Sequence, residues 1–276
     1  MAYTTLKLAF ERLDLKGVHG PALSLVEGEL ATITLNRPEK RNAISTEMID
    51  ELVAALIETE TSVARVVILT GAGEAFCAGM DLESLKQISS QSPDENLEDS
   101  RRMAGMLRRL HSFPKPLIAA VNGPAIAGGC GIATLCDFTL AVPEARFGYS
   151  EVRIGVVPAI VSVFLIRQIG EKRARDLLLS GRILDAAEAH RMGLVTEIVP
   201  SERLLDRARE LAVTLFASSP TSLVRTKQLL RQLSDSDLDR EIELAIQENA
   251  RIRSTANFRE GVASFLEKRK PVWSDR

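Results

Sequence analysis

One glutamate, Glu151, has the setting in this sequence that best suits proton transfer. It lies within residues 147–155 (FGYSEVRIG), in an otherwise apolar neighbourhood. A carboxyl group against an apolar wall has a raised pKa, so it can accept or donate a proton near neutral pH. The spacing fits a solvent-facing glutamate paired with Arg153 equally well. The preceding Ser150 lacks the G-x-S-x-G frame of a hydrolase nucleophile, so a hydrolase is not expected.

Two glycine-rich segments could supply backbone N–H groups to the same reaction. Residues 71–81 (GAGEAFCAGMD) and residues 122–131 (NGPAIAGGCG) each follow an apolar run typical of a strand. A developing enolate oxygen needs two such donors, so the pair suggests an oxyanion hole, although spacing alone does not bring the segments together. The alternative for the second segment is close helix packing through small residues. The first segment starts like a dinucleotide-binding motif, but Phe76 stands where that motif needs Gly or Ala.

A basic loop, residues 36–43 (NRPEKRNA), follows another strand-like run and carries three cations. Cations at the mouth of a sheet could meet the phosphates of a nucleotide-like handle. A solvated turn is the commoner explanation for such a cluster, and the sequence leaves both open. The three histidines lie far apart and make no metal-ligand pair, so no metal site is expected.

The elements that must position these segments alternate between strand and helix in the first half of the chain. Strands are predicted over residues 30–35, 65–70, 116–121 and 138–142. A helix is predicted over residues 45–57, with Ser45 or Thr46 as its N-cap. Such alternation indicates parallel crossovers and an α/β core, in which ligands bind where strands end. Residues 88–100 (ISSQSPDENLEDS) are polar and acidic and are predicted to form a mobile surface loop.

From Pro158 onward the pattern becomes almost wholly helical. Helices are predicted over residues 177–179, 186–192, 204–216, 223–233, 238–252 and 258–268. Gly181 and Gly193 lie where the C-terminal caps of helices belong.

Composition and charge exclude several classes of protein. A net charge of −2 and a pI near 6.0 argue against nucleic-acid binding. No apolar run approaches the ~20 residues that span a bilayer, and residues 1–14 lack the apolar core of a signal peptide. The three cysteines are odd in number, so a disulfide framework is not expected. A reducing cytoplasm is the simpler interpretation.

The four segments, in this order, resemble the enoyl-CoA hydratase/isomerase (crotonase) family. The matching stretches are LNRPEKRNAI, ILTGAGEAFCAGMDL, KPLIAAVNGPAIAGGCGIATLCDF and ARFGYSEVRIGVVP. The similarity runs over residues 25–269, and the late segment FREGVASFLEKRKPVW also looks like the family's C-terminal helix. The resemblance implies a crotonase spiral of repeated ββα turns over residues 1–200. It also implies a C-terminal helical region, residues 201–276, that serves trimerisation and completes the coenzyme A site.

The same resemblance implies an acyl-CoA thioester as substrate, no separate cofactor, and a homotrimer or a dimer of trimers. It places the oxyanion hole at the N–H groups of Met80 and Gly128, with Glu151 as the proton-transfer group. The remaining implied positions are Met80, Asp81, Leu82 and Glu83 along the acyl–pantetheine path, Lys40 and Ala43 near the adenine nucleotide, and Lys268 at a neighbouring subunit's nucleotide. The acyl pocket wall is expected from residues 85–98 and the helix that begins near Pro158.

One position departs from the family pattern. Well-known hydratases carry a second glutamate at the place that Gly131 occupies here. Hydration needs a proton at C2 and an activated water at C3, whereas isomerisation needs one base, so a single Glu151 favours an isomerase on mechanism alone. Against that, GGCG with SEVRIG and VVPAIVS looks like the branch acting on methyl-branched enoyl-CoA, such as 3-methylglutaconyl-CoA hydratase. We therefore expect hydration first, a Δ3,Δ2-enoyl-CoA isomerase second, and a non-catalytic acyl-CoA-binding homologue third.

Overall fold

A computed structural model describes residues 20–88, 90–235 and 237–273, and its main feature is a six-stranded sheet. The strand order is β1-β2-β3-β4-β6-β9, in which β1 and β2 form an antiparallel hairpin and the other neighbours are parallel. The strands are β1 (Ala22–Glu27), β2 (Leu30–Leu35), β3 (Val66–Gly71), β4 (Leu117–Val121), β6 (Phe138–Ala141) and β9 (Glu197–Ile198). The parallel α/β core predicted from the sequence is confirmed, with each predicted strand displaced by at most one residue.

A smaller, three-stranded sheet lies next to the first glycine-rich segment, residues 71–81. It contains β5 (Ala125–Ile126), β7 (Arg146–Gly148) and β8 (Ile183–Asp185), with β5 and β7 parallel. β5 follows β4 almost at once, and β7 leads directly into the segment that carries Glu151. The two sheets therefore bring the second and third segments of interest close together.

The first half of the chain carries helices between its strands. These are η1 (Pro38–Lys40), α2 (Thr46–Thr61), α3 (Leu82–Ile88), α4 (Pro93–Ser112), α5 (Gly128–Thr134) and η2 (Glu151–Ile154). The predicted N-cap is confirmed, because the Ser45 side chain accepts a hydrogen bond from the N–H of Met48. The helix after it continues to Thr61, four residues beyond the predicted end.

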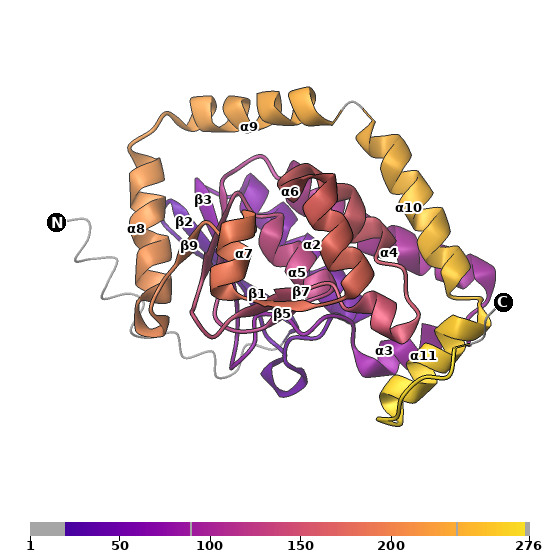
Figure 1. Cartoon of the computed structure of the whole chain (residues 1–276). Coiled ribbons are helices and arrows are strands. Elements are labelled where there is room, and N and C mark those ends of the chain that lie inside the picture. The colour runs from indigo at the N-terminus through magenta and orange to yellow at the C-terminus, as the bar shows by residue number, and fades with distance from the viewer. Residues whose placement is uncertain (1–19, 89, 236, 274–276) are drawn as a thin grey trace.

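The second half of the chain is helical, as predicted. Its helices are α6 (Ala159–Ser180), α7 (Ala186–Met192), η3 (Ser201–Arg203), α8 (Leu204–Phe216), α9 (Pro220–Ser234), α10 (Leu238–Ile252) and α11 (Ala256–Leu266). Gly181 and Gly193 end α6 and α7 in the left-handed conformation, which confirms both predicted caps. Helices α8, α9 and α10 run as an outer frame around the body, and α11 returns to lie beside α3 (Figure 1).

The prediction for residues 88–100 is wrong. α3 ends at Ile88, and α4 begins at Pro93 with Ser92 as its N-cap. The Ser92 hydroxyl accepts from the N–H of Glu95, while the Glu95 carboxylate accepts from the N–H of Ser92, which is a capping box. Proline at the first position of the helix completes this start signal. The polar composition belongs to an amphipathic helix rather than to a loop.

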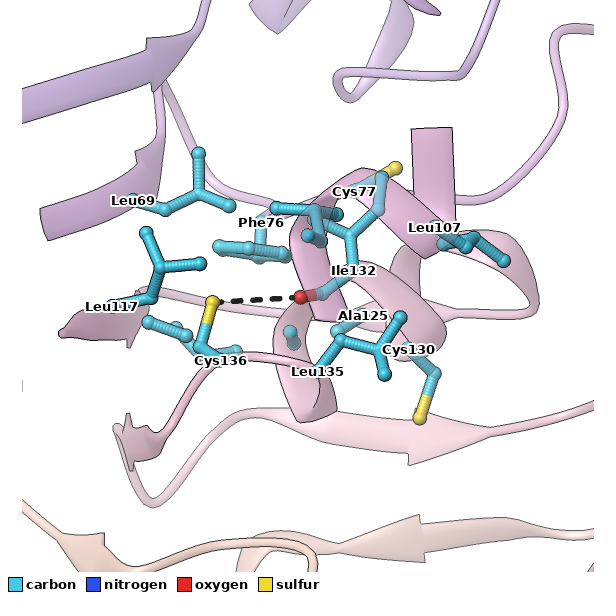
Figure 2. Packing of buried hydrophobic residues seen from close by; sticks show 14 of the residues in the cluster. Leu69, Phe76, Cys77, Leu107, Leu117, Ala125, Cys130, Ile132, Leu135 and Cys136 are labelled. Atoms are coloured by element: carbon cyan, nitrogen blue, oxygen red, sulfur yellow. Dashed lines mark hydrogen bonds between the residues drawn. The ribbon is translucent and has the colours of Figure 1, made fainter. Parts of the chain in front are cut away.

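The core between the sheet and α5 is close-packed (Figure 2). Ile132 of α5 lies beside Phe76 and Cys77, Cys130 lies on the opposite side of the helix, and the Cys136 thiol donates to the carbonyl of Ile132. All three cysteines are buried and free. Burial raises the pKa of Cys77 and of Cys130 to about 12, so neither thiol is a nucleophile at neutral pH.

Residues 1–14 lie outside the described residues. No helix within the described ranges combines the length and the apolarity that crossing a bilayer requires. The boundary predicted between residues 200 and 201 stays a prediction, although α8 packs on β3, β4 and β6 and α10 packs on α4 and α6.

Candidate active site

A cavity of about 490 Å³ gathers residues from all four segments singled out in the sequence. The predicted residues that line it are Lys40, Ala43, Met80, Asp81, Leu82, Gly128 and Glu151. The predicted residues that are not among its lining are Glu83, Gly131 and Lys268. The fold therefore brings the glycine-rich loops, the basic loop and Glu151 to one place.

The two glycine-rich loops run side by side at this cavity. Cys77 and Ala125 form a parallel bridge, and the N–H of Ile126 donates to the carbonyl of Cys77 at 2.9 Å. Met80 and Gly128 each follow that bridge by three residues. Among residues 20–88, 90–235 and 237–273, neither the N–H of Met80 nor that of Gly128 has a protein acceptor. Both N–H groups are available to a ligand.

Strand pairing directs the Met80 N–H away from the neighbouring chain. Ile44 pairs with Met80, and its hydrogen bonds run from Ile44 N–H to the carbonyl of Gly79 and from Asp81 N–H to the carbonyl of Ile44. Because successive peptide groups of an extended chain point to opposite sides, the N–H of Met80 points away from Ile44. On that other edge Cys77 pairs with Ala125, three residues before Gly128.

A glycine and a strained alanine allow the close approach of these loops. Gly79 has φ +91°, and a Cβ there would lie 3.1 Å from the carbonyl oxygen of Ile126 and 3.2 Å from Cβ of Ala127. Ala127 itself has φ 53° and ψ −123°, a backbone conformation that residues other than glycine rarely adopt. Its N–H donates to the carbonyl of Gly148 at 2.7 Å, which holds this conformation in place. This hydrogen bond thereby fixes the peptide group that presents the N–H of Gly128.

Glu151 opens η2 and lines the cavity. Its Oε2 atom is buried and has no hydrogen-bond partner in the described part of the chain. Burial raises the pKa of Glu151 to about 7, against a smaller lowering by its own backbone N–H. Arg153 is exposed, and among the described residues it forms no ion pair with Glu151. The alternative of a solvent-facing pair of Glu151 and Arg153 is therefore not observed. The structure instead has a carboxyl group that can exchange a proton near neutral pH.

Helix α11 holds the segment of Glu151 in place. A Cβ on Gly155 would lie 2.4 Å from the carbonyl oxygen of Asn257, and a Cβ on Gly261 would lie 2.2 Å from that of Ile154. Only glycine at both positions permits such contact between backbones. Helix α11 therefore fixes the position of the segment that carries Glu151.

Gly131 is buried on α5 and faces α4 and α6, at Leu107 and Val161, which lie between it and the cavity as part of the lining. A Cβ at this position would lie 3.1 Å from Cγ1 of Val161 and 3.7 Å from Cδ2 of Leu107. The first atom of any side chain at residue 131 would therefore already press on Val161, which must shift to admit a carboxylate. Glu151 is accordingly the one buried carboxyl group of the described lining that lacks a partner.

A second carboxylate of the lining, Asp81, has a structural role. One of its oxygens accepts from Arg37 Nη2 at 2.9 Å, and the other accepts from the N–H of Glu83 at 2.8 Å. Burial acts to raise the pKa of Asp81, but the N–H of Glu83 and the Arg37 guanidinium outweigh it and hold the pKa below its usual value. Asp81 therefore stays ionised and ties the basic loop to the loop of Met80.

The basic loop divides its three cations between two tasks. Arg37 turns inward, where its Nη1 donates to the carbonyl of Ala43 at 2.8 Å in addition to the Asp81 contact. Lys40 and Arg41 are exposed and line the cavity. Two cations therefore remain at the cavity for the phosphates of a ligand, and their role as a nucleotide site stays a prediction.

Several lining residues were not predicted from the sequence. They come from α4, from α10 and the residue that follows it, and from α11, and are Met103, Leu107, Asn249, Arg253, Phe258 and Phe265. The expected wall at residues 85–98 is represented by Leu85 and Ile88, and the expected helix near Pro158 is α6. Lys268 follows α11 and is exposed, and its predicted contact with a neighbouring subunit stays a prediction. Among the described residues, His, Cys, Asp and Glu side chains form no group of three that could hold a metal ion.

The sequence model of one family, described as enoyl-CoA hydratase/isomerase, matches residues 26–276. The chain belongs to the enoyl-CoA hydratase/isomerase family. A Thermus thermophilus protein that is named provisionally as an enoyl-CoA hydratase is 45% identical over 246 residues, which cover 89% of this chain and 97% of the relative. The 1,2-epoxyphenylacetyl-CoA isomerase of Escherichia coli is 34% identical, with coverages of 92% and 98%. The family is thus shown, and it contains both reaction classes.

A solved structure supports the same assignment. The crystal structure of an enoyl-CoA hydratase from Mycobacterium avium has a TM-score of 0.83 and 33% identity, covering 93% of this chain and all of that one. The crotonase fold and the helical C-terminal region predicted from the sequence are confirmed. The branch acting on methyl-branched substrates stays a prediction.

Proposed function

We propose that this family member is an enoyl-CoA hydratase that adds water to a 2-enoyl-CoA thioester, with Glu151 as the proton-transfer group. The observation that carries the proposal is the buried, unpartnered Oε2 of Glu151, which lies in the same cavity as the free N–H groups of Met80 and Gly128. A base and two preorganised donors are the groups that an enolate reaction needs.

The proposed step runs through one carboxyl group. The Glu151 carboxylate takes a proton from water while the water oxygen forms a bond to C3. The C2=C3 electron pair moves toward the thioester, and the negative charge that develops on its oxygen accepts hydrogen bonds from Met80 and Gly128. Glu151 then returns the proton to C2, which yields the 3-hydroxyacyl thioester and restores the carboxylate.

A pKa near 7 is what lets one group serve both halves of the addition. At neutral pH the carboxyl group of Glu151 populates its charged and neutral forms in comparable amounts. The charged form accepts the proton from water, and the neutral form delivers it to C2. The provisional name of the Thermus relative also favours hydration.

An isomerase is the second candidate, and the packing at Gly131 favours it. Gly131 carries no carboxyl group and its neighbours Val161 and Leu107 are apolar, so a single base is what this side of the cavity offers. One base suffices to remove a proton from C2 of a 3-enoyl thioester and return it to C4, which moves the double bond to C2=C3. The name of the Escherichia coli relative shows that isomerases occur at this level of similarity.

A single set of assays separates these candidates. Purified protein is given crotonyl-CoA and 3-methylglutaconyl-CoA in 18O-labelled water, and loss of the conjugated thioester absorbance is followed together with label in the product. Hydration predicts both signals, and Glu151→Gln should lower the rate by about 10²–10⁴-fold. A 3-enoyl-CoA that gains conjugation without label would identify an isomerase. Coenzyme A thioester binding without turnover would identify a non-catalytic homologue.

The predicted homotrimer or dimer of trimers is supported by one surface. Helix α9 stands away from the body, and its Leu229, Leu230 and Leu233 are each more than half exposed. Such a row of apolar side chains on one helix fits a partner surface better than it fits water. Light scattering on the purified chain tests the proposal: a monomer at micromolar concentration would contradict it. The cytoplasmic location stays a prediction.

A further inference from the structure

A buried ion pair forms part of the cavity wall. Arg253 follows the last turn of α10 and lines the cavity with a side chain that is 4% exposed. Its Nη1 lies 2.7 Å from Oδ2 of Asp99 on α4, whose side chain is 21% exposed. Within the described chain, Asp99 is the one hydrogen-bond partner of the Arg253 guanidinium. Its other N–H donors have no protein acceptor there.

The pair can be located relative to the oxyanion hole along α4. Asp99, Met103 and Leu107 follow one another at four-residue spacing, so they lie on one face of the helix, about 6 Å apart. A Cβ on Gly128 would lie 3.9 Å from Cε of Met103. The partner of Arg253 is therefore one helical turn along from the residue that touches Gly128, which carries one of the free N–H groups.

The spacing of about 6 Å between Asp99 and Met103 is comparable to the length of a short acyl chain. Carbon–carbon bonds are about 1.5 Å long, so the fifth or sixth carbon of a zigzag chain is roughly 5–6 Å from its thioester carbonyl. With the carbonyl oxygen at Met80 and Gly128, the end of such a chain comes to the region of Arg253. Otherwise the wall of this region is apolar, with Leu85, Ile88 and Phe258.

A second donor lies beside the guanidinium. Asn249 precedes Arg253 by one turn of α10 and also lines the cavity. Its Oδ1 lies 3.0 Å from the Ser100 hydroxyl, and its Nδ2 donates to the carbonyl of Val157 through a long contact of 3.4 Å. An amide N–H and a guanidinium fork side by side match the oxygens of a carboxylate.

We propose that Arg253, with Asn249 beside it, selects acyl chains that end in a carboxylate, so that the substrates are short dicarboxylic enoyl-CoA thioesters. This inference rests on the proposed function, because it takes the thioester to be held by Met80 and Gly128. A methyl-ended chain buries its end against a charged fork whose free donors it cannot satisfy. The terminal carboxylate of a five- or six-carbon acyl chain accepts hydrogen bonds from those donors, while Asp99 keeps Arg253 in position.

Binding of saturated thioesters tests the proposal without turnover. Calorimetry compares glutaryl-CoA with pentanoyl-CoA, which have the same chain length and differ only at the end. The intact protein should bind glutaryl-CoA about tenfold more tightly or better, which corresponds to about 1.4 kcal/mol. Arg253→Met together with Asp99→Leu removes both charges and keeps the contact between α10 and α4 apolar, a replacement that proteins often tolerate. In this variant the affinity ratio should fall to about one.

Asp99→Asn separates recognition from a merely structural pair. The asparagine can still accept from Arg253 but no longer neutralises it, so the preference for glutaryl-CoA should increase. Equal affinities in the intact protein, a preference that survives the double substitution, or an Asp99→Asn variant with an unchanged ratio would overturn the proposal. Hydration of crotonyl-CoA with no preference for dicarboxylic chains would overturn this inference alone, whereas turnover of no enoyl-CoA would overturn the proposed function.

Discussion

Cγ1 of Val161 lies 3.1 Å from the point that a Cβ atom on Gly131 would occupy. Ordinary contacts of a Cβ atom are longer, so even an alanine at residue 131 would require Val161 to move. A glutamate would add four more heavy atoms than alanine in the same direction. The single-carboxylate site is therefore determined by two residues on facing helices, α5 and α6, and not by Gly131 alone.

The first prediction concerns this pair. Gly131→Glu should destabilise the protein by about 1–3 kcal/mol through overpacking and should not raise the hydration rate. Adding Val161→Ala removes the atom in the way, and the double variant should hydrate crotonyl-CoA about tenfold faster or more than Val161→Ala does, because a second acid–base group becomes available. Urea unfolding and initial rates measure the two effects. A stable single variant with raised activity would show that Val161 does not block the site.

The pH dependence of turnover provides the second prediction. If water is activated by the Glu151 carboxylate, kcat/KM should fall about tenfold for each pH unit below its pKa, which burial places at about 7. The profile should be flat from pH 8 to the point where another group titrates. A midpoint near 4.5, the ordinary value for glutamate, would mean that the group is solvated when the enzyme acts.

Much of this site could be predicted from the sequence, and the reason lies in the parallel sheet. Met80 and Gly128 each sit in a loop that follows a buried strand, and loops after parallel strands meet at one edge. Two local glycine-rich patterns therefore predicted that loops far apart in the sequence meet in the fold. Glu151 follows β7 in the same way, although it was the resemblance to a family, and not its spacing, that distinguished it from a surface residue.

What could not be predicted depends on packing between distant helices. Residues 93–100 looked like a loop because their charges outnumber their apolar residues, although Ser92 and Glu95 have the spacing of a capping box. Arg253 lies 154 residues from its partner Asp99, at the end of α10, and no local pattern distinguishes it from the exposed arginines nearby. The same holds for Val161, whose effect on Gly131 exists only once α5 and α6 are packed together.

Stability should change with pH through the same glutamate, and this is the third prediction. The pKa of Glu151 is about 7 in the folded protein and near 4.5 when unfolded. Ionisation therefore costs more in the folded state, and Glu151 lowers the free energy of unfolding as the pH rises above 4.5. The free energy of unfolding should therefore fall between pH 4.5 and 7, by up to about 3 kcal/mol from this group. Glu151→Gln should be more stable than the parent at pH 8 and equal to it at pH 4.5. Urea titrations at both pH values measure the difference.

Gly79 allows a matched test of the oxyanion hole, which is the fourth prediction. Gly79→Ala places a methyl 3.1 Å from the carbonyl oxygen of Ile126 and should separate the loops that carry Met80 and Gly128. Loss of one donor typically lowers kcat by about 10²–10³-fold. Gly193→Ala is the control, since Gly193 has φ +89° against +91° for Gly79 but nothing within 4 Å of its Cβ position. Its kcat should be unchanged; equal losses in both variants would attribute the effect to backbone strain.

The fifth prediction concerns the ion pair that joins the basic loop to the loop of Met80. Asp81→Ala leaves Arg37 without its carboxylate and the N–H of Glu83 without its acceptor, both in a largely buried setting. We expect a loss of about 2–4 kcal/mol and a raised KM for the thioester, because the loop that carries Lys40 loses its anchor. Asp50→Ala breaks the exposed pair with Arg102 and should cost about 0–1 kcal/mol with no change in KM. If the two variants lose the same stability and keep the same KM, the contact between Arg37 and Asp81 does not organise the site.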